Sequence, residues 1–146
     1  MNTKDTINKA LVKLKLNEPL KALNIINFPV PSDSRMRKTT ASGNIFTYYN
    51  SGISSYLPIA TMAEKYGLSL REGKLNILDF GCGVGRLLLH FNRVYKSNNY
   101  FACDIDDTSM NFIAKNYPNV DSHTNNHVPP LKYNYSQFDM IYSLSI

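Results

Sequence analysis

The chain has 146 residues, of which 43% are hydrophobic and 18% charged, and this balance is typical of one globular domain with a single core. Its two cysteines predict neither a disulfide framework nor a metal site. No apolar run approaches the length of a membrane span or the core of a signal peptide, so we expect a cytoplasmic protein without membrane contact.

The formal net charge of +5 belongs to the N-terminal part of the chain. Eight Lys or Arg residues accompany three Asp or Glu residues up to Thr40, whereas the two kinds balance at eight each from Ala41 onward. Apolar residues at helical spacing on either side of Asn17 predict a helical hairpin there. Because no arginine–aromatic interleaving accompanies the lysines, the charge favours a solvated helix face over a nucleic-acid site.

A segment rich in Pro and Ser follows the predicted hairpin. Residues 28–43 have the sequence FPVPSDSRMRKTTASG, which predicts an extended linker. A helix is then expected from about Ser54 to Tyr66, with Gly67 at its C-terminal stop. We therefore expect two parts, a helical and extended arm over residues 1–43 and a ligand-binding domain over residues 44–146.

From residue 75 onward the pattern alternates between strand and helix. Short apolar runs predict strands at Leu75–Phe80, Tyr100–Asp104, Val120–Thr124 and Phe138–Ile146. Helices are predicted at Arg86–Tyr95 and after a cap at Asp106 or Asp107. This alternation is typical of an α/β fold with a parallel sheet, in which ligands bind beyond the carboxyl ends of the strands.

The most informative stretch is NILDFGCGVGR, residues 76–86. Gly81, Gly83 and Gly85 follow a buried strand and precede a helix, so the backbone turns sharply there and leaves room for a ligand. The following helix offers unpaired N–H groups and a partial positive charge. Asp79 ends the strand beside the turn, where its carboxylate would order the loop or meet a cationic group. This arrangement predicts a nucleotide-like ligand.

A second acid, Asp104, ends the second predicted strand. A carboxylate at that position accepts hydrogen bonds from ribose hydroxyls in nucleotide-binding sheets, which makes NAD one candidate ligand. The dinucleotide fingerprint, however, spaces its glycines G-x-G-x-x-G, whereas this chain has G-x-G-x-G with Arg86 at the place of the last glycine. An NAD-binding domain is therefore the lesser alternative.

Three segments in order, LDFGCGVGR, CDID and FDMIYSLS, resemble the class I S-adenosylmethionine-dependent methyltransferases. The resemblance covers about half of the chain, from Leu75 to the end. It implies a Rossmann-like, doubly wound parallel sheet, of which this chain would hold the first four of seven strands after its helical N-terminal arm. It also implies S-adenosylmethionine as the cofactor, S-adenosylhomocysteine as the product, and a methyl acceptor that we expect to be a small molecule and cannot identify.

The resemblance assigns the first part of the cofactor site to the glycine turn and the two acids. The methionine and ribose part of the cofactor would lie along Gly81, Cys82, Gly83 and Gly85. Asp79 would lie near the cofactor's amino group, directly or through water. Asp104 would hold the ribose hydroxyls.

The adenine end and the substrate side are assigned in the same way. Ile105 would pack on adenine, and Asn125 or Asn126 would meet the adenine amino group. Ser143 would face the cofactor or the substrate. No catalytic residue is assigned, although His127 is a candidate general base as well as a plain loop residue.

The family's sheet has three further strands, so the resemblance predicts a fragment that does not transfer methyl groups by itself. A non-catalytic cofactor-binding or interaction module that works with a partner chain is the alternative from another class. We also expect the segment Phe138–Ile146 to leave an exposed apolar sheet edge, through which a second copy would pair to form a homodimer.

Overall fold

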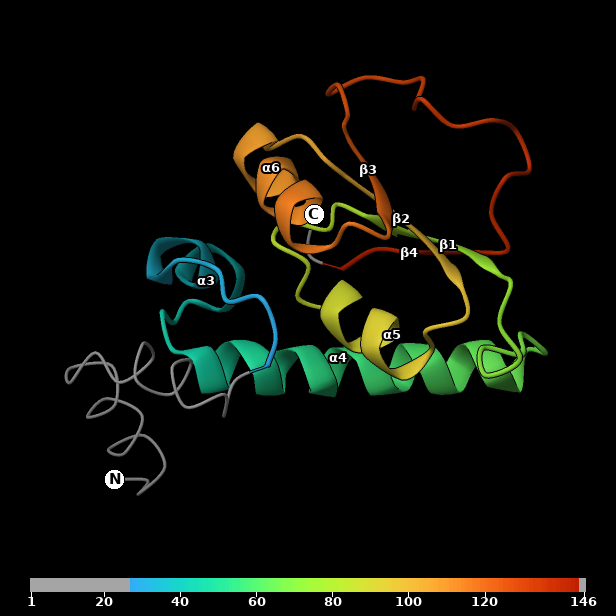
Figure 1. Cartoon of the computed structure of the whole chain (residues 1–146), viewed down its shortest axis with the longest axis horizontal. Coiled ribbons are helices and arrows are strands. Elements are labelled where there is room, and N and C mark those ends of the chain that lie inside the picture. The colour runs from blue at the N-terminus through green and yellow to red at the C-terminus, as the bar shows by residue number, and fades with distance from the viewer. Residues whose placement is uncertain (1–26, 145–146) are drawn as a thin grey trace. The chain divides into compact units, whose positions relative to one another are not determined.

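The computed structural model describes residues 27–144 (Figure 1). In chain order the elements are α3 (Asp33–Thr40), α4 (Ile45–Lys65), β1 (Asn76–Phe80), α5 (Leu88–Val94), β2 (Asn99–Asp104), α6 (Asp107–Asn116), β3 (Val120–Thr124) and β4 (Met140–Tyr142). The described residues divide into two compact units, with the division after Ser51. The predicted helical hairpin falls outside the described residues, and the expected boundary at residue 43 stays a prediction.

The four strands form one parallel sheet in the order β3-β2-β1-β4. This confirms the predicted α/β fold and all four strands, although β4 is shorter than the apolar run that predicted it. The chain moves outward from β1 to β3 and then returns to pair β4 with the other side of β1. The strand order therefore reverses between β1 and β4, and ligands of such sheets bind beyond the carboxyl ends of strands at that point.

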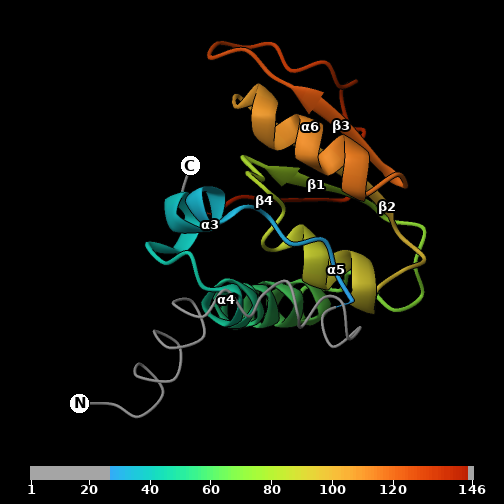
Figure 2. The same cartoon turned by 60° about the vertical axis from the view of Figure 1, so that its left-hand side comes forward.

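The core of the second unit lies on one face of the sheet, where α5 and α6 pack (Figure 2). Phe91 of α5 stacks on Tyr142 with ring centroids 4.7 Å apart, and its carbonyl accepts a hydrogen bond from the Tyr100 hydroxyl. Met110 and Ile113 of α6 join the same buried cluster. These aromatic and aliphatic contacts fix both helices against the strands and so set where the turns between them lie.

The prediction of an extended linker over residues 28–43 was wrong, because eight of these residues form α3. Asp33 lies in the first turn of α3, while Arg37 and Lys38 lie in the last turn, and both placements favour the helix dipole. Ala41 ends the helix in the left-handed conformation. The prolines precede the helix and do not interrupt it. The Pro-rich composition therefore wrongly predicted extended backbone for the residues after 32.

Helix α4 begins at Ile45 instead of Ser54, because Asn44 caps it. The Asn44 side-chain oxygen accepts hydrogen bonds from the backbone N–H groups of Phe46 and Thr47, at 2.8 and 3.1 Å. At the other end Gly67 has a φ of 89°, and the N–H groups of Gly67 and Leu68 reach back to carbonyls of the last turn. These two bonds form a Schellman motif, which confirms Gly67 as the predicted stop.

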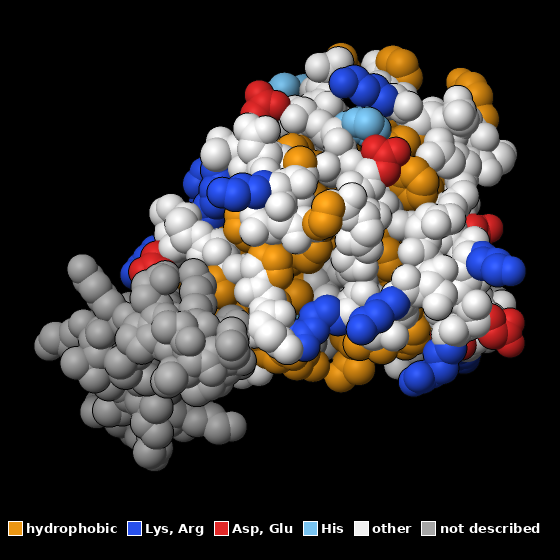
Figure 3. Space-filling model, viewed as in Figure 1, with side chains coloured by type: hydrophobic (Ala, Val, Ile, Leu, Met, Phe, Trp, Pro, Cys, Tyr) orange, Lys and Arg blue, Asp and Glu red, His pale blue; other side chains and the backbone are white. Residues whose placement is uncertain are grey.

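Figure 3 shows Lys and Arg side chains spread over this face, with a few Asp and Glu side chains among them. Within residues 27–144, no helix combines the length and the apolarity that crossing a membrane requires.

Candidate functional site

The glycine turn is tied to the carboxyl end of β2. The backbone N–H groups of Gly81 and Cys82 both donate to the carbonyl of Cys103, at 2.8 and 3.1 Å. Gly81, Gly83 and Gly85 all have positive φ values, of 72°, 52° and 79°. Because side-chain-bearing residues rarely adopt such values, the alternation of glycines permits this path of the backbone.

The second and third glycines of the turn have different surroundings. A Cβ atom placed on Gly83 would meet no atom within 4 Å, so this side of the turn is open. A Cβ atom on Gly85 would lie 2.9 Å from the Cδ1 atom of Ile113 in α6. Gly85 therefore allows close packing of the turn against α6, whereas Gly83 leaves free space beside the backbone.

The Asp104 carboxylate holds the turn from the neighbouring strand. One oxygen accepts the N–H of Gly83 at 2.7 Å, and the other accepts the N–H of Asp106 at 2.9 Å. Asp106, one of the two caps that the sequence predicted, caps α6 by accepting the N–H of Thr108 at 3.0 Å. Since a carboxylate offers about four acceptor sites, these two bonds leave Asp104 able to accept further donors.

A pocket of about 410 Å³ lies at the carboxyl ends of β1, β2 and β3. Its lining residues are Phe80, Gly81, Asp104, Ile105, Asn125, Asn126, His127, Val128, Pro129 and Leu131. The structure thus brings together five of the predicted site residues from three separate segments. The backbone N–H of Asn125 donates to the Asp104 carbonyl at 3.0 Å, which draws the segment after β3 toward the end of β2.

Sequence reasoning missed the apolar wall of this pocket. Val128, Pro129 and Leu131 follow the two predicted asparagines and line the side of the pocket formed by the loop after β3. The loop is placed by an aromatic cluster on the sheet face opposite α5 and α6, where Tyr133 packs edge-on against Phe101. The short apolar run from Val128 to Leu131, within an otherwise polar loop, was the feature of the sequence that could have indicated this wall.

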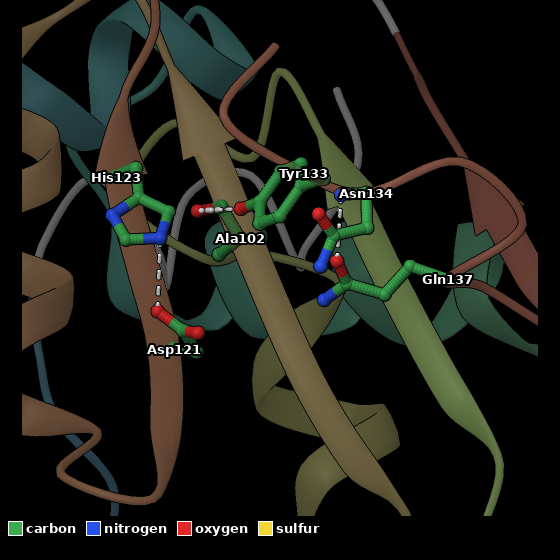
Figure 4. A network of polar contacts seen from close by, with 6 residues as sticks. All are labelled: Ala102, Asp121, His123, Tyr133, Asn134 and Gln137. Carbon is green, nitrogen blue, oxygen red and sulfur yellow. Dashed lines mark hydrogen bonds and ion pairs between the residues drawn. The ribbon is translucent and has the colours of Figure 1, made fainter.

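Figure 4 shows the polar contacts that accompany this cluster. The Tyr133 hydroxyl donates to the Ala102 carbonyl at 3.3 Å, and His123 of β3 lies 3.1 Å from Asp121. The backbone N–H of Asn134 donates to the Gln137 side chain at 3.0 Å. The Tyr133 contact holds the loop across the sheet on its way to β4, and His123 pairs with an acid of its own strand.

Asp79 and Ser143 do not line the pocket. Asp79 is 5% exposed, and its Oδ2 accepts the Tyr142 hydroxyl at 3.1 Å. Burial raises the pKa of the Asp79 carboxyl from its ordinary 3.8 to about 7, against the opposing effect of hydrogen bonds from Tyr142 and the Leu88 backbone. The Ser143 hydroxyl donates to the Phe80 carbonyl at 2.8 Å. The predicted ligand contacts of both residues stay predictions.

Cys82 is buried in the turn, and its sulfur lies 3.7 Å from that of Met110. Burial, followed by the nearby Asp79 and Asp104 carboxylates, raises the pKa of the Cys82 thiol well above its usual value. Burial likewise raises the pKa of Cys103 to about 11. Both thiols are therefore neutral near pH 7, which makes them poor nucleophiles.

Residues 77–146 match the sequence model of a family described as a methyltransferase domain. No curated protein sequence matches the chain. Among solved structures, PKMT2 from Rickettsia typhi in complex with AdoHcy shares 28% identity with a TM-score of 0.40, covering 48% of this chain and 14% of that one. A TehB-like SAM-dependent methyltransferase from Corynebacterium glutamicum shares 18% identity with a TM-score of 0.44, covering 63% and 54%.

Coclaurine N-methyltransferase bound to N-methylheliamine and SAH shares 20% identity with a TM-score of 0.47, covering 63% of this chain and 26% of that one. The chain thus spans between 14% and 54% of the length of these three proteins.

The parallel sheet, its strand order and the glycine turn define a Rossmann-like domain of the methyltransferase type. The predicted resemblance to class I S-adenosylmethionine-dependent methyltransferases is thus confirmed for residues 77–146, just under half of the chain.

Proposed function

We propose that this chain binds S-adenosylmethionine and S-adenosylhomocysteine as the cofactor-binding part of a methyltransferase. One observation carries the proposal: a single pocket is lined by Gly81, by Asp104 and Ile105, and by Asn125 and Asn126. These residues come from the ends of three different strands, and the resemblance assigns Gly81, Asp104, Ile105 and one of the two asparagines to the cofactor. The matched family supports the same ligand.

Each wall of the pocket suits one part of the cofactor. The free acceptor sites of Asp104 suit the ribose hydroxyls, since hydrogen bonds to a charged acceptor are stronger than neutral ones. Ile105, Val128 and Pro129 offer apolar surface to the adenine ring, and Asn126 lines the same pocket. The open side of Gly83 leaves room for the methionine part along the turn.

Methyl transfer is a displacement in which the cofactor supplies the activated methyl group. This chain's contribution would be to bind and orient the cofactor, with Asp104 and the glycine turn as the rigid support. His127 lines the pocket and stays the candidate for moving a proton, although no substrate position is assigned to it. The acceptor would be a small molecule held by parts of a methyltransferase beyond the pocket described above.

The proposal is tested by calorimetry with S-adenosylhomocysteine, NADH and 2′-deoxy-S-adenosylhomocysteine. We expect S-adenosylhomocysteine to bind more tightly than NADH. Asp104→Ala should weaken its binding about tenfold or more, because charge-assisted hydrogen bonds to the ribose are lost. Tighter binding of NADH would contradict the proposal and favour a dinucleotide-binding domain.

Asp104→Ala also releases the N–H of Gly83, so its effect alone does not isolate the ribose contact. A thermodynamic cycle with the deoxy ligand isolates this contact. Removing the 2′-hydroxyl should weaken binding to the wild-type chain and should change the affinity of Asp104→Ala little. Asp107→Ala, which removes an exposed acid from the first turn of α6, is the charge-matched control and should bind normally. Equal losses from the deoxy ligand in both chains would contradict the ribose assignment.

A further inference from the structure

The end of β4 holds the end of β1 at two consecutive residues. In the parallel pairing Tyr142 lies opposite Asp79, and its hydroxyl donates to the Asp79 carboxylate at 3.1 Å. The next residue, Ser143, donates to the carbonyl of Phe80 at 2.8 Å. Asp79 and Phe80 are the two residues immediately before Gly81. The glycine turn thus starts from a point that β4 fixes through both a side chain and the backbone.

The Tyr142 hydroxyl has one orientation available to it. Its ring is 5% exposed and stacks on Phe91 with an interplanar angle of 21°, so the ring does not move freely. Burial, together with the nearby Asp79 carboxylate, raises the pKa of Tyr142 well above its usual value. Tyr142 therefore stays protonated near pH 7, and toward Asp79 it acts as a hydrogen-bond donor.

Asp79 connects this donor to α5. Besides the Tyr142 hydroxyl, the backbone of Leu88 at the start of that helix lowers the pKa of the Asp79 carboxyl. The charged and titratable groups around it are Tyr142 of β4, Arg86 of the loop before α5, Asp104 and Cys103 of β2, and Cys82 of the turn. Tyr142, the Leu88 backbone and Arg86 favour the ionised carboxylate, whereas burial and Asp104 oppose it.

We infer that Tyr142 is a positioning residue for the proposed cofactor site, which holds the base of the glycine turn through its hydrogen bond to Asp79. The inference rests on the proposed function. The sequence motifs assign no role to Tyr142, and through this contact the buried acid would support the turn from beneath. Removing only the Tyr142 hydroxyl should raise the pKa of Asp79. The affinity for the ligand should then fall at those pH values where the Asp79 carboxylate becomes neutral.

The test compares the whole wild-type chain with Tyr142→Phe and with Tyr100→Phe. Tyr100 is also buried on the same face, but its hydroxyl donates to the carbonyls of Phe91 and Tyr95, so this variant controls for the loss of a buried hydroxyl. NMR of the carboxyl carbon follows the titration of Asp79. We expect its midpoint to rise by about one pH unit in Tyr142→Phe and to stay unchanged in Tyr100→Phe.

Binding of S-adenosylhomocysteine is then measured from pH 6 to pH 9. If the midpoint moves from about 7 to about 8, the ionised fraction at pH 7 falls about fivefold, and the affinity of Tyr142→Phe should fall by the same factor. At pH 9 the two affinities should converge. An unchanged Asp79 midpoint, an equal shift in Tyr100→Phe, or a shift without any change in affinity would overturn the inference.

Two further measurements separate the inference from the proposed function. A wild-type chain that binds no S-adenosylhomocysteine would reject the proposed function and, with it, the cofactor role, whereas the NMR titration would still decide whether Tyr142 controls Asp79. If Tyr142→Phe fails to fold, Asp79→Asn replaces it, because this variant keeps the side chain's shape and removes its charge. The pH dependence of binding should then disappear, and its persistence would overturn the inference.

Discussion

At the scale of single residues, the two acids that end β1 and β2 have opposite surroundings. Asp104 is partly exposed, lines the pocket and receives two backbone N–H groups. Asp79 is buried beneath the turn, where loss of solvation raises its pKa to about 7. The sequence places the same kind of side chain at or next to the end of both strands, and the depth of burial separates the acid that lines the pocket from the acid that lies beneath the turn.

The raised pKa of Asp79 makes stability depend on pH. An acid whose pKa is higher in the folded chain than in the unfolded one binds more protons when folded, so its stabilising effect is present at low pH and lost as pH rises through about 7. From pH 5 to pH 8 the free energy of unfolding should fall by roughly 2–3 kcal/mol. Asp79→Asn should remove most of this fall.

Urea unfolding of both chains at pH 5 and pH 8 measures this effect. The midpoint of the wild-type chain should be lower at pH 8, and that of Asp79→Asn should differ little between the two conditions. Equal falls in both chains would mean that another group is responsible.

At the scale of elements, a glycine determines how closely α4 approaches α5. A Cβ atom on Gly52 would lie 2.7 Å from the Arg86 carbonyl and 2.5 Å from the His90 ring. Beside it, Tyr56 stacks on His90 with ring centroids 5.7 Å apart. Because Arg86 directly follows the glycine turn, this crossing also supports the segment that leads from the turn into α5.

Gly52→Ala should therefore destabilise the chain, although replacing glycine by alanine inside a helix ordinarily stabilises it by roughly 0.5–1 kcal/mol. The added methyl group meets a backbone carbonyl that does not move aside, and we expect a loss of about 1–3 kcal/mol. Ser54→Ala, at an exposed position of the same helix, is the matched control and should be neutral or slightly stabilising. Thermal unfolding of the two variants decides the sign.

At the scale of the whole molecule, β4 is an edge strand with an apolar groove beside it. A groove of about 450 Å³ is lined by Pro58, Ile59, Met62, Ala63, Tyr66, Leu68, Met140, Ile141 and Tyr142, none of which is charged. The Ile141 side chain is 62% exposed. Unpaired strand edges of this kind associate with other strands, and we propose that a second copy of the chain pairs there across a two-fold axis.

Light scattering should then show a dimer or larger species for the wild-type chain. Ile141→Lys should shift the population toward monomer, because a charge at the edge opposes pairing. Val94→Lys changes an equally apolar, half-exposed side chain at the end of α5 and should leave the association unchanged. A wild-type monomer with slow amide exchange along Met140–Leu144 would contradict the proposal.

Local patterns in the sequence were sufficient to predict most of the second unit. The strands β1, β2 and β3, the Asp106 cap, the Gly67 stop and the glycine turn all depend on residues that are close together along the chain. Strand periodicity, capping and positive φ values are local properties, so they can be recognised without knowing the fold. Segment 33–40 is the exception, because its local composition favoured a linker and the chain forms α3 instead.

The features that only the tertiary structure decided depend on contacts between distant residues. Tyr142 and Asp79 are 63 positions apart, and their pairing follows from the return of β4 to the side of β1. The different surroundings of Gly83 and Gly85 depend on where α6 packs, and the apolar wall at Val128 depends on the path of its loop across the sheet. The sequence by itself predicted which residues form the candidate site, whereas burial and packing decided which of them line the pocket and which lie beneath the turn.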